Sequence, residues 1–332
     1  MKNHQFKNVF ITGGAGYVGS SLVPKLLAEG YNVTVYDLFI YGDYLQNHPN
    51  LKKIKGDIRD RNKLIKAAKK SDAFIHLACI SNDPSFDLDP KLGKSINFDA
   101  FRNVISAAKL ADVNRFILAS STSQYGVKDP KMQVTEEETP EPKTDYARFK
   151  IECEKMLAEA DLGKIVYAFI RPATICGFAP RLRLDLSVNI LTVNALINKK
   201  IKIFGGSQLR PTLNIKDMVR IYELMLTAPA EKIHKQAFNV GYRNITIKEL
   251  ANLVKETLKD PKITFEITST DDKRSYHINS DKIKRVLGFE TKFTVEDAIV
   301  SIKEAYEKGL IIDGLNNPIY HNVKQMKLIN LK

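Results

Sequence analysis

A tyrosine and a lysine lie four residues apart, at Tyr146 and Lys150, in a segment whose pattern is typical of a helix. Residues at i and i+4 share one helix face, so the ammonium can sit close to the phenol. A nearby cation lowers the pKa of a tyrosine from about 10 towards the working pH, which lets the phenol take a proton from a substrate hydroxyl. The same spacing also occurs in ordinary exposed pairs, so the prediction of a general base depends on the surrounding residues.

Hydroxyl groups are concentrated in residues 120–126, with the sequence Ser-Ser-Thr-Ser-Gln-Tyr-Gly. This segment ends an apolar run, 115–120, that is typical of a strand. Open α/β sheets bind ligands at the carboxyl edge of their strands, where these hydroxyls would lie. We therefore expect one hydroxyl to contact the same substrate oxygen as Tyr146; the alternative is a plain Ser/Thr-rich turn.

A glycine-rich loop lies near the start of the chain. Thr12 is followed by Gly-Gly-Ala-Gly-Tyr-Val-Gly, which fits G-x-G-x-x-G through Gly14, Gly16 and Gly19 and equally G-x-x-G-x-x-G through Gly13, Gly16 and Gly19. Glycines allow a tight turn and close approach of a pyrophosphate to the amides of a helix N-terminus. Because a bare glycine pattern also occurs in simple turns, a second feature is needed.

An acidic residue at the end of the next predicted strand is that second feature. Asp37 ends the apolar run 32–37, at the position where dinucleotide-binding folds contact the adenosine ribose. A carboxylate there accepts hydrogen bonds from both ribose hydroxyls and repels a 2′-phosphate, so NAD is favoured over NADP. Asp57 follows another short strand, 53–55, and either lies against the adenine or belongs to a solvated turn.

The elements that must position these residues alternate along the first half of the chain. Strands are predicted over 8–12, 32–37, 73–77, 115–120 and 165–171, and helices over 17–29, 94–111 and 144–160. This alternation predicts a parallel sheet with helices on both faces. The predicted fold class is α/β: a Rossmann-type doubly wound parallel sheet with a smaller mixed α/β C-terminal substrate domain.

The alternation ends near Gly177, which suggests a division of the chain. A dinucleotide-binding domain is expected over residues 1–178, with 215–242 returning to it, and a substrate domain over 179–214 and 243–332. In these later parts, helices are predicted over 186–198, 217–226, 246–258 and 295–308, and strands over 201–204 and 237–240.

The composition is that of a globular protein. The chain has 332 residues, 44% hydrophobic and 27% charged, and its net charge of +13 comes from lysines that are interleaved with acidic residues rather than clustered. No apolar run reaches the roughly 18 residues of a membrane span, and the N-terminus lacks the apolar segment of a secretory signal. We expect no nucleic-acid or membrane partner and a cytoplasmic location. Three scattered cysteines indicate neither a disulfide framework nor a metal site.

As an ordered set, these residues resemble the extended short-chain dehydrogenase/reductases and, within them, the NAD-dependent nucleotide-sugar epimerase/dehydratase family. The resemblance runs from residue 8 to about residue 288. Its motifs are the glycine loop, Asp37, Asp57-x-x-Asp60, His76-Leu77-Ala78, Asn97, Ser121 with Tyr146-x-x-x-Lys150, and Arg171-Pro172-x-x-x-x-Gly177. Their order along the chain is far more specific than any one of them.

The resemblance implies a role for each matched residue. Tyr146 would be the base, Lys150 would hold the nicotinamide ribose and lower the pKa of Tyr146, and Ser121 would orient the substrate hydroxyl. NAD would be bound by Gly13, Gly16, Tyr17, Val18, Gly19, Asp37, Asp57, Ile58, Leu77, Ala78, Asn97, Lys150 and Pro172. A nucleotide-diphosphate sugar would be bound by Ser121, Thr122, Arg181, Arg210 and Arg274. Family members commonly form homodimers through helices that match 94–111 and 144–160, and no metal is implied.

One departure from the family pattern bears on the reaction. The 4,6-dehydratases of the family carry Asp-Glu directly after the catalytic Ser or Thr to eliminate water, whereas Thr122 and Ser123 stand here. We therefore predict a nucleotide-sugar epimerase that acts at C4 through a transient 4-keto intermediate. A 4-dehydrogenase or 4-keto reductase of an NDP-sugar (hexose or GDP-heptose) is the alternative, and a non-catalytic binding protein is the third. Cys176, Pro211 and Asn214 also depart from the family and indicate an unusual substrate pocket.

Overall fold

A seven-stranded parallel sheet forms the centre of the computed structural model, which describes residues 6–129, 131–270, 275–329 and 331. The strands are β1 (Asn8–Thr12), β2 (Asn32–Asp37), β3 (Leu51–Lys55), β4 (Ala73–His76), β5 (Arg115–Ala119), β6 (Val166–Pro172) and β10 (Gln236–Val240). Their spatial order is β10-β6-β5-β4-β1-β2-β3, so the chain changes direction across the sheet between β1 and β4. In sheets of this kind, ligands bind outside the carboxyl ends of the strands at that switch point.

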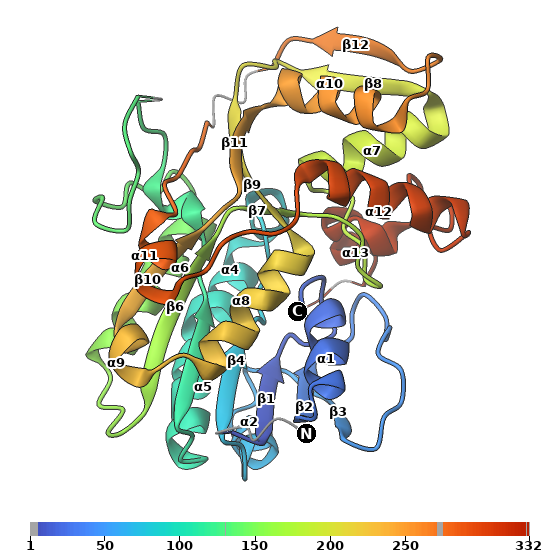
Figure 1. The fold of residues 1–332 in the computed structure, drawn as a ribbon. Helices are drawn as coiled ribbons and strands as arrows, with labels where there is room; N and C mark the ends of the chain where they lie inside the picture. Colours follow the sequence, from blue (N-terminus) through green and yellow to red (C-terminus); the bar gives the residue numbers. More distant parts are fainter. Residues whose placement is uncertain (1–5, 130, 271–274, 330, 332) are drawn as a thin grey trace.

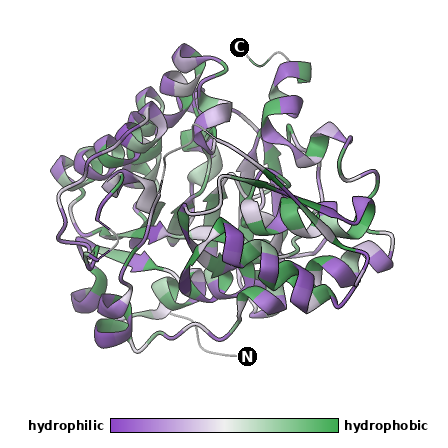
Figure 2. Ribbon diagram, turned by 90° about the horizontal axis from the view of Figure 1, so that it is seen from above, coloured by the Kyte–Doolittle hydropathy of each residue, from purple (hydrophilic) through white to green (hydrophobic). Residues whose placement is uncertain are grey.

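Helices cover both faces of the sheet, as Figure 1 shows. One face packs against α1 (Gly19–Ala28) and α8 (Ile215–Thr227), and the other against α2 (Arg61–Ala68), α5 (Phe101–Leu110) and α6 (Asp145–Glu159). Seen from above in Figure 2, the covering helices alternate hydrophobic and hydrophilic residues, as expected for elements with one buried face. The predicted doubly wound α/β fold is confirmed.

A smaller α/β part, much of it between β6 and the C-terminus, lies over the carboxyl end of the sheet (Figure 1). It contains a three-stranded sheet of β7 (Thr174–Cys176), β9 (Leu209–Asn214) and β11 (Arg243–Thr246), and a parallel pair, β8 (Lys200–Phe204) and β12 (Thr264–Thr268). Its helices are α7 (Ser187–Asn198), α10 (Ile247–Leu258) and α12 (Val295–Glu307), with the short α9 (Ala230–Ile233) and α11 (Asp281–Leu287) beside β10. The sequence pattern did not predict β7, β9, β11 or β12, because each is short or mostly polar.

The helix predicted over 94–111 is interrupted in the structure. After α3 (Asp83–Phe86), a short α4 (Pro90–Lys94) leads into a π-helical turn at Ser95–Asp99, and only then does α5 begin. The turn contains Asn97, whose amide donates to the Ile80 carbonyl (2.9 Å) and accepts from the Ile80 N–H (2.8 Å). The prediction of one continuous helix was therefore wrong; π turns are rare and concentrate at functional sites.

The C-terminal segment returns to the carboxyl end of the sheet. The short helix Pro318–Tyr320 and α13 (Asn322–Ile329) follow α12. Leu184 N–H donates to the Tyr320 carbonyl (2.8 Å) and the Gln325 amide to the Ile40 carbonyl (2.6 Å). The last helix thus joins loops from both halves of the chain. Among the described residues no helix has the length and apolar character that crossing a bilayer requires.

Candidate active site

One cavity of about 560 Å³ lies at the carboxyl ends of β1, β2, β4, β5 and β6 and extends to the smaller α/β part. It is lined by Gly13, Gly16, Tyr17, Val18, Gly19, Asp37, Asp57, Ile58, Leu77, Ala78, Ser121, Thr122, Tyr146, Lys150, Pro172, Arg181 and Arg210. Asn97 lies behind the wall and holds Ile80, and Arg274 lies outside the described residues. The fold thus brings residues from distant parts of the chain into one cavity.

The glycine loop approaches the end of β4 so closely that a side chain cannot fit. Gly13 has φ +74°, and an added Cβ would lie 2.5 Å from the Ala78 nitrogen. At Gly19 an added Cβ would lie 2.3 Å from the Gly14 carbonyl oxygen. Both glycines are therefore required for the tight turn before α1, which leaves the first amides of the helix free for an anion. This geometry fits a dinucleotide pyrophosphate.

We expect Gly13→Ala to weaken NAD binding at least tenfold, because the methyl group would push the glycine loop away from Ala78. Gly163→Ala is the matched control: Gly163 also has a positive φ, +55°, but nothing lies within 4 Å of its added Cβ. In the control, the free energy of unfolding should fall by only roughly 1–2 kcal/mol, the cost of a side chain at a left-handed backbone position, and NAD should bind normally. Equilibrium titration with NAD, beside thermal unfolding, checks both; equal NAD affinities in the two variants would contradict the prediction.

Asp37 is held with its carboxylate at the edge of the cavity. Its oxygens accept hydrogen bonds from the Ala15 N–H (2.9 Å) and the Phe39 N–H (2.8 Å). Burial raises the pKa of Asp37, while these N–H groups and the charge of Arg181 act to lower it. The carboxylate lies where β2 ends beside the glycine loop, which fits the recognition of ribose hydroxyls in NAD. Asp57 also lines the cavity, but its oxygens already accept from the Arg59 guanidinium (2.6 Å), so its contact with adenine stays a prediction.

Tyr146 and Lys150 project from the first turns of α6 towards the cavity. Thr144 starts this helix by accepting a hydrogen bond from the Ala147 N–H (3.2 Å). Lys150 Nζ donates to the Ala119 carbonyl at the end of β5 (2.7 Å) and lies 5.8 Å from the centre of the Tyr146 ring. Burial raises the pKa of Tyr146, and the ammonium of Lys150 lowers it only in part. The pairing is as expected, but in this structure desolvation outweighs the nearby charge.

The hydroxyl-rich segment lines the same cavity as Tyr146. Ser121 lines the cavity, and its Oγ accepts from the Ser123 N–H (3.2 Å) and shares a hydrogen bond with Ser123 Oγ (2.9 Å). Thr122 Oγ1 donates to the Pro172 carbonyl (3.0 Å) and so joins the ends of β5 and β6. Ser121 Oγ keeps a lone pair that a hydrogen bond from a substrate hydroxyl could use.

A buried ion pair supports the floor of this site. Glu154 on α6 pairs with the Arg171 guanidinium (2.6 Å), and each residue is less than a tenth exposed. Glu154 also accepts from Ser120, and Arg171 donates to the Tyr125 hydroxyl (2.8 Å). Burial lowers the pKa of Arg171, and the carboxylate more than offsets this effect. The Arg171 of the sequence motif is therefore a structural cation beneath the serine segment.

Several lining residues escaped the sequence analysis. Arg183 and Asp185, from the loop before α7, form a bidentate ion pair inside the cavity (both contacts 2.9 Å). Cys79 faces Tyr146 and Lys150, and Tyr41 and Asn322 also line the wall. For Arg183 and Asp185, the only signal in the sequence is the Arg-rich character of the loop. Tyr41 and Asn322 belong to no recognisable motif, so nothing in the sequence pointed to them.

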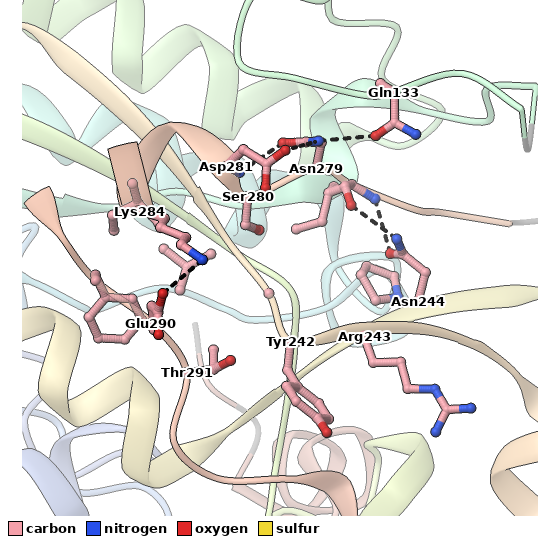
Figure 3. Close-up of a pocket in the computed structure, with 16 residues that line it drawn as sticks. Gln133, Tyr242, Arg243, Asn244, Asn279, Ser280, Asp281, Lys284, Glu290 and Thr291 are labelled. Carbon is pink, nitrogen blue, oxygen red and sulfur yellow. Dashed lines mark hydrogen bonds and ion pairs between the residues drawn. The ribbon is translucent and has the colours of Figure 1, made fainter. Parts of the chain in front are cut away.

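A second cavity, of about 410 Å³, lies beside β11 and α11 and is shown in Figure 3. Several of its polar side chains are bonded to one another: Lys284 pairs with Glu290 (2.8 Å), and Asn279 donates to Gln133 (3.0 Å) and Asp281 (2.8 Å). It contains neither the glycine loop nor the Tyr146–Lys150 pair. The chemistry-bearing residues therefore belong to the larger cavity.

Comparison with known proteins agrees with this geometry. A model described as the NAD-dependent epimerase/dehydratase family matches residues 9–241. The chain is 28% identical over 325 residues to a UDP-glucose 4-epimerase of Lactobacillus helveticus, covering 91% of this chain and 97% of that protein. It is 30% identical over 311 residues to UDP-glucuronic acid decarboxylase 4 of Arabidopsis thaliana, covering 88% of this chain and 66% of that protein.

A solved structure of MoeE5 in complex with UDP-glucuronic acid and NAD is similar over 91% of this chain and 99% of that chain, with a TM-score of 0.79 and 25% identity. The glycine loop and Asp37 fit the dinucleotide that this neighbour contains. The family model covers most of the chain, and the cavity is lined by all but two of the residues that the resemblance implies for the site. The chain therefore belongs to the NAD-dependent nucleotide-sugar epimerase/dehydratase family of the extended short-chain dehydrogenase/reductases, and NAD is its cofactor.

Proposed function

We propose that this enzyme is a nucleotide-sugar epimerase that acts at C4 through a transient 4-keto sugar. The relatives include both epimerases and decarboxylases, so sequence similarity alone does not identify the reaction. The observation that carries the proposal is the combination of Ser121, Tyr146 and Lys150 with an NAD site in a cavity where no described carboxyl group is left without a partner. Such a site can remove and return hydrogen at a hydroxyl-bearing carbon without promoting elimination.

Four carboxylates line the described part of the cavity, and each has a partner in the protein. Asp37 accepts from backbone N–H groups and Asp57 from Arg59. Asp83 accepts from the Thr144 hydroxyl (2.7 Å). Burial raises the pKa of Asp185, but the Arg183 cation brings it below the ordinary value, so this group stays ionised near neutral pH. None of the four is placed as a proton donor for the loss of water, which disfavours a dehydratase.

In the proposed reaction Tyr146 takes the proton of the C4 hydroxyl while Ser121 orients the oxygen. NAD, held by the glycine loop and Asp37, would supply the acceptor and donor of the hydride at C4. Lys150, fixed on the Ala119 carbonyl, holds its charge close to the phenol and offsets part of the burial of Tyr146. The 4-keto sugar turns between the two transfers while the nucleotide remains bound, so positioning accounts for much of the catalysis.

The proposed substrate handle is the diphosphate of the nucleotide, which Arg210 would contact. Arg210 lines the cavity from β9, with its guanidinium 5.7 Å from the centre of the Tyr276 ring. We propose that residues 179–214 and 243–332 bind the nucleotide sugar, and that residues 1–178 with 215–242 bind NAD. A role for Arg274 in the same diphosphate site, a homodimer through α5 and α6, and a cytoplasmic location stay predictions.

The test is to purify the protein without added cofactor, release its nucleotide by denaturation, and then supply a panel of UDP-, dTDP-, GDP- and CDP-sugars. We expect near-stoichiometric NAD or NADH and conversion of one nucleotide sugar into its C4 epimer, with no net change in absorbance at the NADH wavelength. Net accumulation of NADH with a 4-keto product would instead establish the 4-dehydrogenase. Loss of water from the sugar would overturn the argument from the paired carboxylates.

A further inference from the structure

Arg181 is among the most deeply buried charged residues of the described chain, with 2% of its surface exposed. It lies in the loop between β7 and α7, yet its backbone N–H donates to Ser20 Oγ (3.1 Å) on α1. Ser20 directly follows Gly19 of the glycine loop. A loop from the C-terminal half of the chain is therefore fastened to the helix end where the pyrophosphate of a dinucleotide binds.

The guanidinium of Arg181 has no anionic partner among the described residues. Its Nη2 donates to the neutral Asn322 side chain, its guanidinium carbon lies 3.8 Å from the centre of the Tyr41 ring, and its Nε has no hydrogen-bond partner. Burial lowers the pKa of Arg181 to about 10, and nearby Arg183 acts in the same direction. Buried cations are normally paired, because an isolated charge is costly to remove from water.

The neighbouring arginine shows the contrast. Arg183, two residues along the same loop, has its charge met by both oxygens of Asp185. Arg181 lines the same cavity, forms no ion pair with a described residue and keeps an unpartnered Nε. Asp185, the acidic group nearest in the loop, is engaged by Arg183, so Arg181 rather than Arg183 is available for an anionic ligand.

We propose that Arg181 binds the diphosphate of the NAD cofactor from the side opposite the glycine loop. The sequence analysis expected Arg181 to bind the substrate, but its attachment to Ser20 and its influence on Asp37 place it on the cofactor side. Arg210, from β9 beside Tyr276, remains the arginine of the substrate side. A cation from the C-terminal half of the chain would thus complete the NAD-binding site, whichever reaction the sugar undergoes.

The last helix of the chain holds Arg181 in place. Asn322, at the start of α13, accepts from Arg181 and donates to Ser81 Oγ (3.0 Å). Gln325 on the same helix is bonded to the Ile40 carbonyl (2.6 Å) in the loop after β2. Asn322 is therefore a positioning residue, and its removal should weaken NAD binding less than removal of the guanidinium does.

The experiment compares full-length wild-type, Arg181→Gln, Arg181→Lys and Arg210→Gln proteins, each stripped of nucleotide, by calorimetric titration with ADP-ribose and with adenosine. We expect Arg181→Gln to weaken ADP-ribose binding about 10- to 100-fold, as for loss of a charged hydrogen bond, and to leave adenosine binding unchanged, because adenosine has no diphosphate. Arg181→Lys should recover part of the loss. Arg210→Gln should bind ADP-ribose like the wild type, and the amount of NAD retained on purification should fall only in the Arg181 variants.

An unchanged affinity of Arg181→Gln for ADP-ribose would overturn the proposal. The same titration is made with UDP or GDP, whichever the wild type binds more tightly. If Arg181→Gln weakens the binding of that nucleotide instead, Arg181 is a substrate ligand, as predicted from the sequence. Equal losses for adenosine and ADP-ribose would make Arg181 a purely structural residue. Thermal unfolding of the stripped proteins separates misfolding from loss of a ligand: Arg181→Gln should unfold no lower than wild type, since it removes an unpaired buried charge. None of these readouts depends on turnover, so they stand even if the C4 reaction is wrong.

Discussion

Replacing Tyr146 by Phe should lower the turnover of the nucleotide sugar by about 10²- to 10⁴-fold, the usual contribution of a general acid or base. The substitution removes only the hydroxyl and keeps the ring that packs in the partly buried face of α6. Because burial raises the pKa of Tyr146, the base form is scarce at neutral pH, and wild-type turnover should rise as the pH is increased. Steady-state kinetics across pH check this, and the rising limb should vanish in Tyr146→Phe.

Tyr167→Phe is the matched control for this experiment. Tyr167 is buried on β6 and packs edge-on against Phe169 and His234, away from the cavity. The control should retain wild-type turnover and the same pH profile. Full activity of Tyr146→Phe with an unchanged profile would show that another group moves the proton, and equal losses in both variants would show a general effect of removing a buried phenol.

Replacing Glu154 by Gln should lower the free energy of unfolding by roughly 3–5 kcal/mol, the cost of leaving a buried charge without its partner. Gln keeps the size of the side chain but removes the negative charge that two groups of Arg171 contact, at 3.0 and 2.6 Å. The Ser120 hydroxyl also loses its ionised acceptor. Because this network lies under the Ser120–Ser121 segment, turnover should fall together with stability. Urea unfolding, with an unchanged m-value, measures the change in the free energy of unfolding.

Glu152→Gln provides the comparison on the same helix. Glu152 pairs with Lys155 (3.1 Å), but its side chain is 38% exposed, and such a pair contributes only about 0–1 kcal/mol. The double variant Glu154→Leu with Arg171→Met should recover much of the lost stability, since it removes both buried charges. If Glu154→Gln lowers the free energy of unfolding as little as Glu152→Gln does, water or another group compensates the charge of Arg171.

The local patterns predicted the main strands of the central sheet and the candidate residues of the site. Strands β1, β4 and β5 are apolar runs buried in the sheet, and the glycine loop and Tyr146-x-x-x-Lys150 each lie within one turn or one helix. Such features depend on residues that are close in sequence, so periodicity and spacing report them. The fold class and the grouping of the predicted residues in one cavity follow from the same patterns, because parallel strands bring their carboxyl ends to one edge.

The partners of charged side chains were decided only by the tertiary structure. The sequence could not show that Arg171 is buried against Glu154, that Asp57 is paired with Arg59, or that Arg181 is buried with an unpartnered Nε. It also missed the short polar strands β7, β9, β11 and β12, which are held by pairing rather than by their own propensity. The sequence by itself therefore predicted candidate residues for the chemistry and the elements that carry them. Burial and long-range contacts decided the ion pairs and pKa shifts of these residues, since desolvation and ion pairing depend on what the folded chain places within a few ångströms.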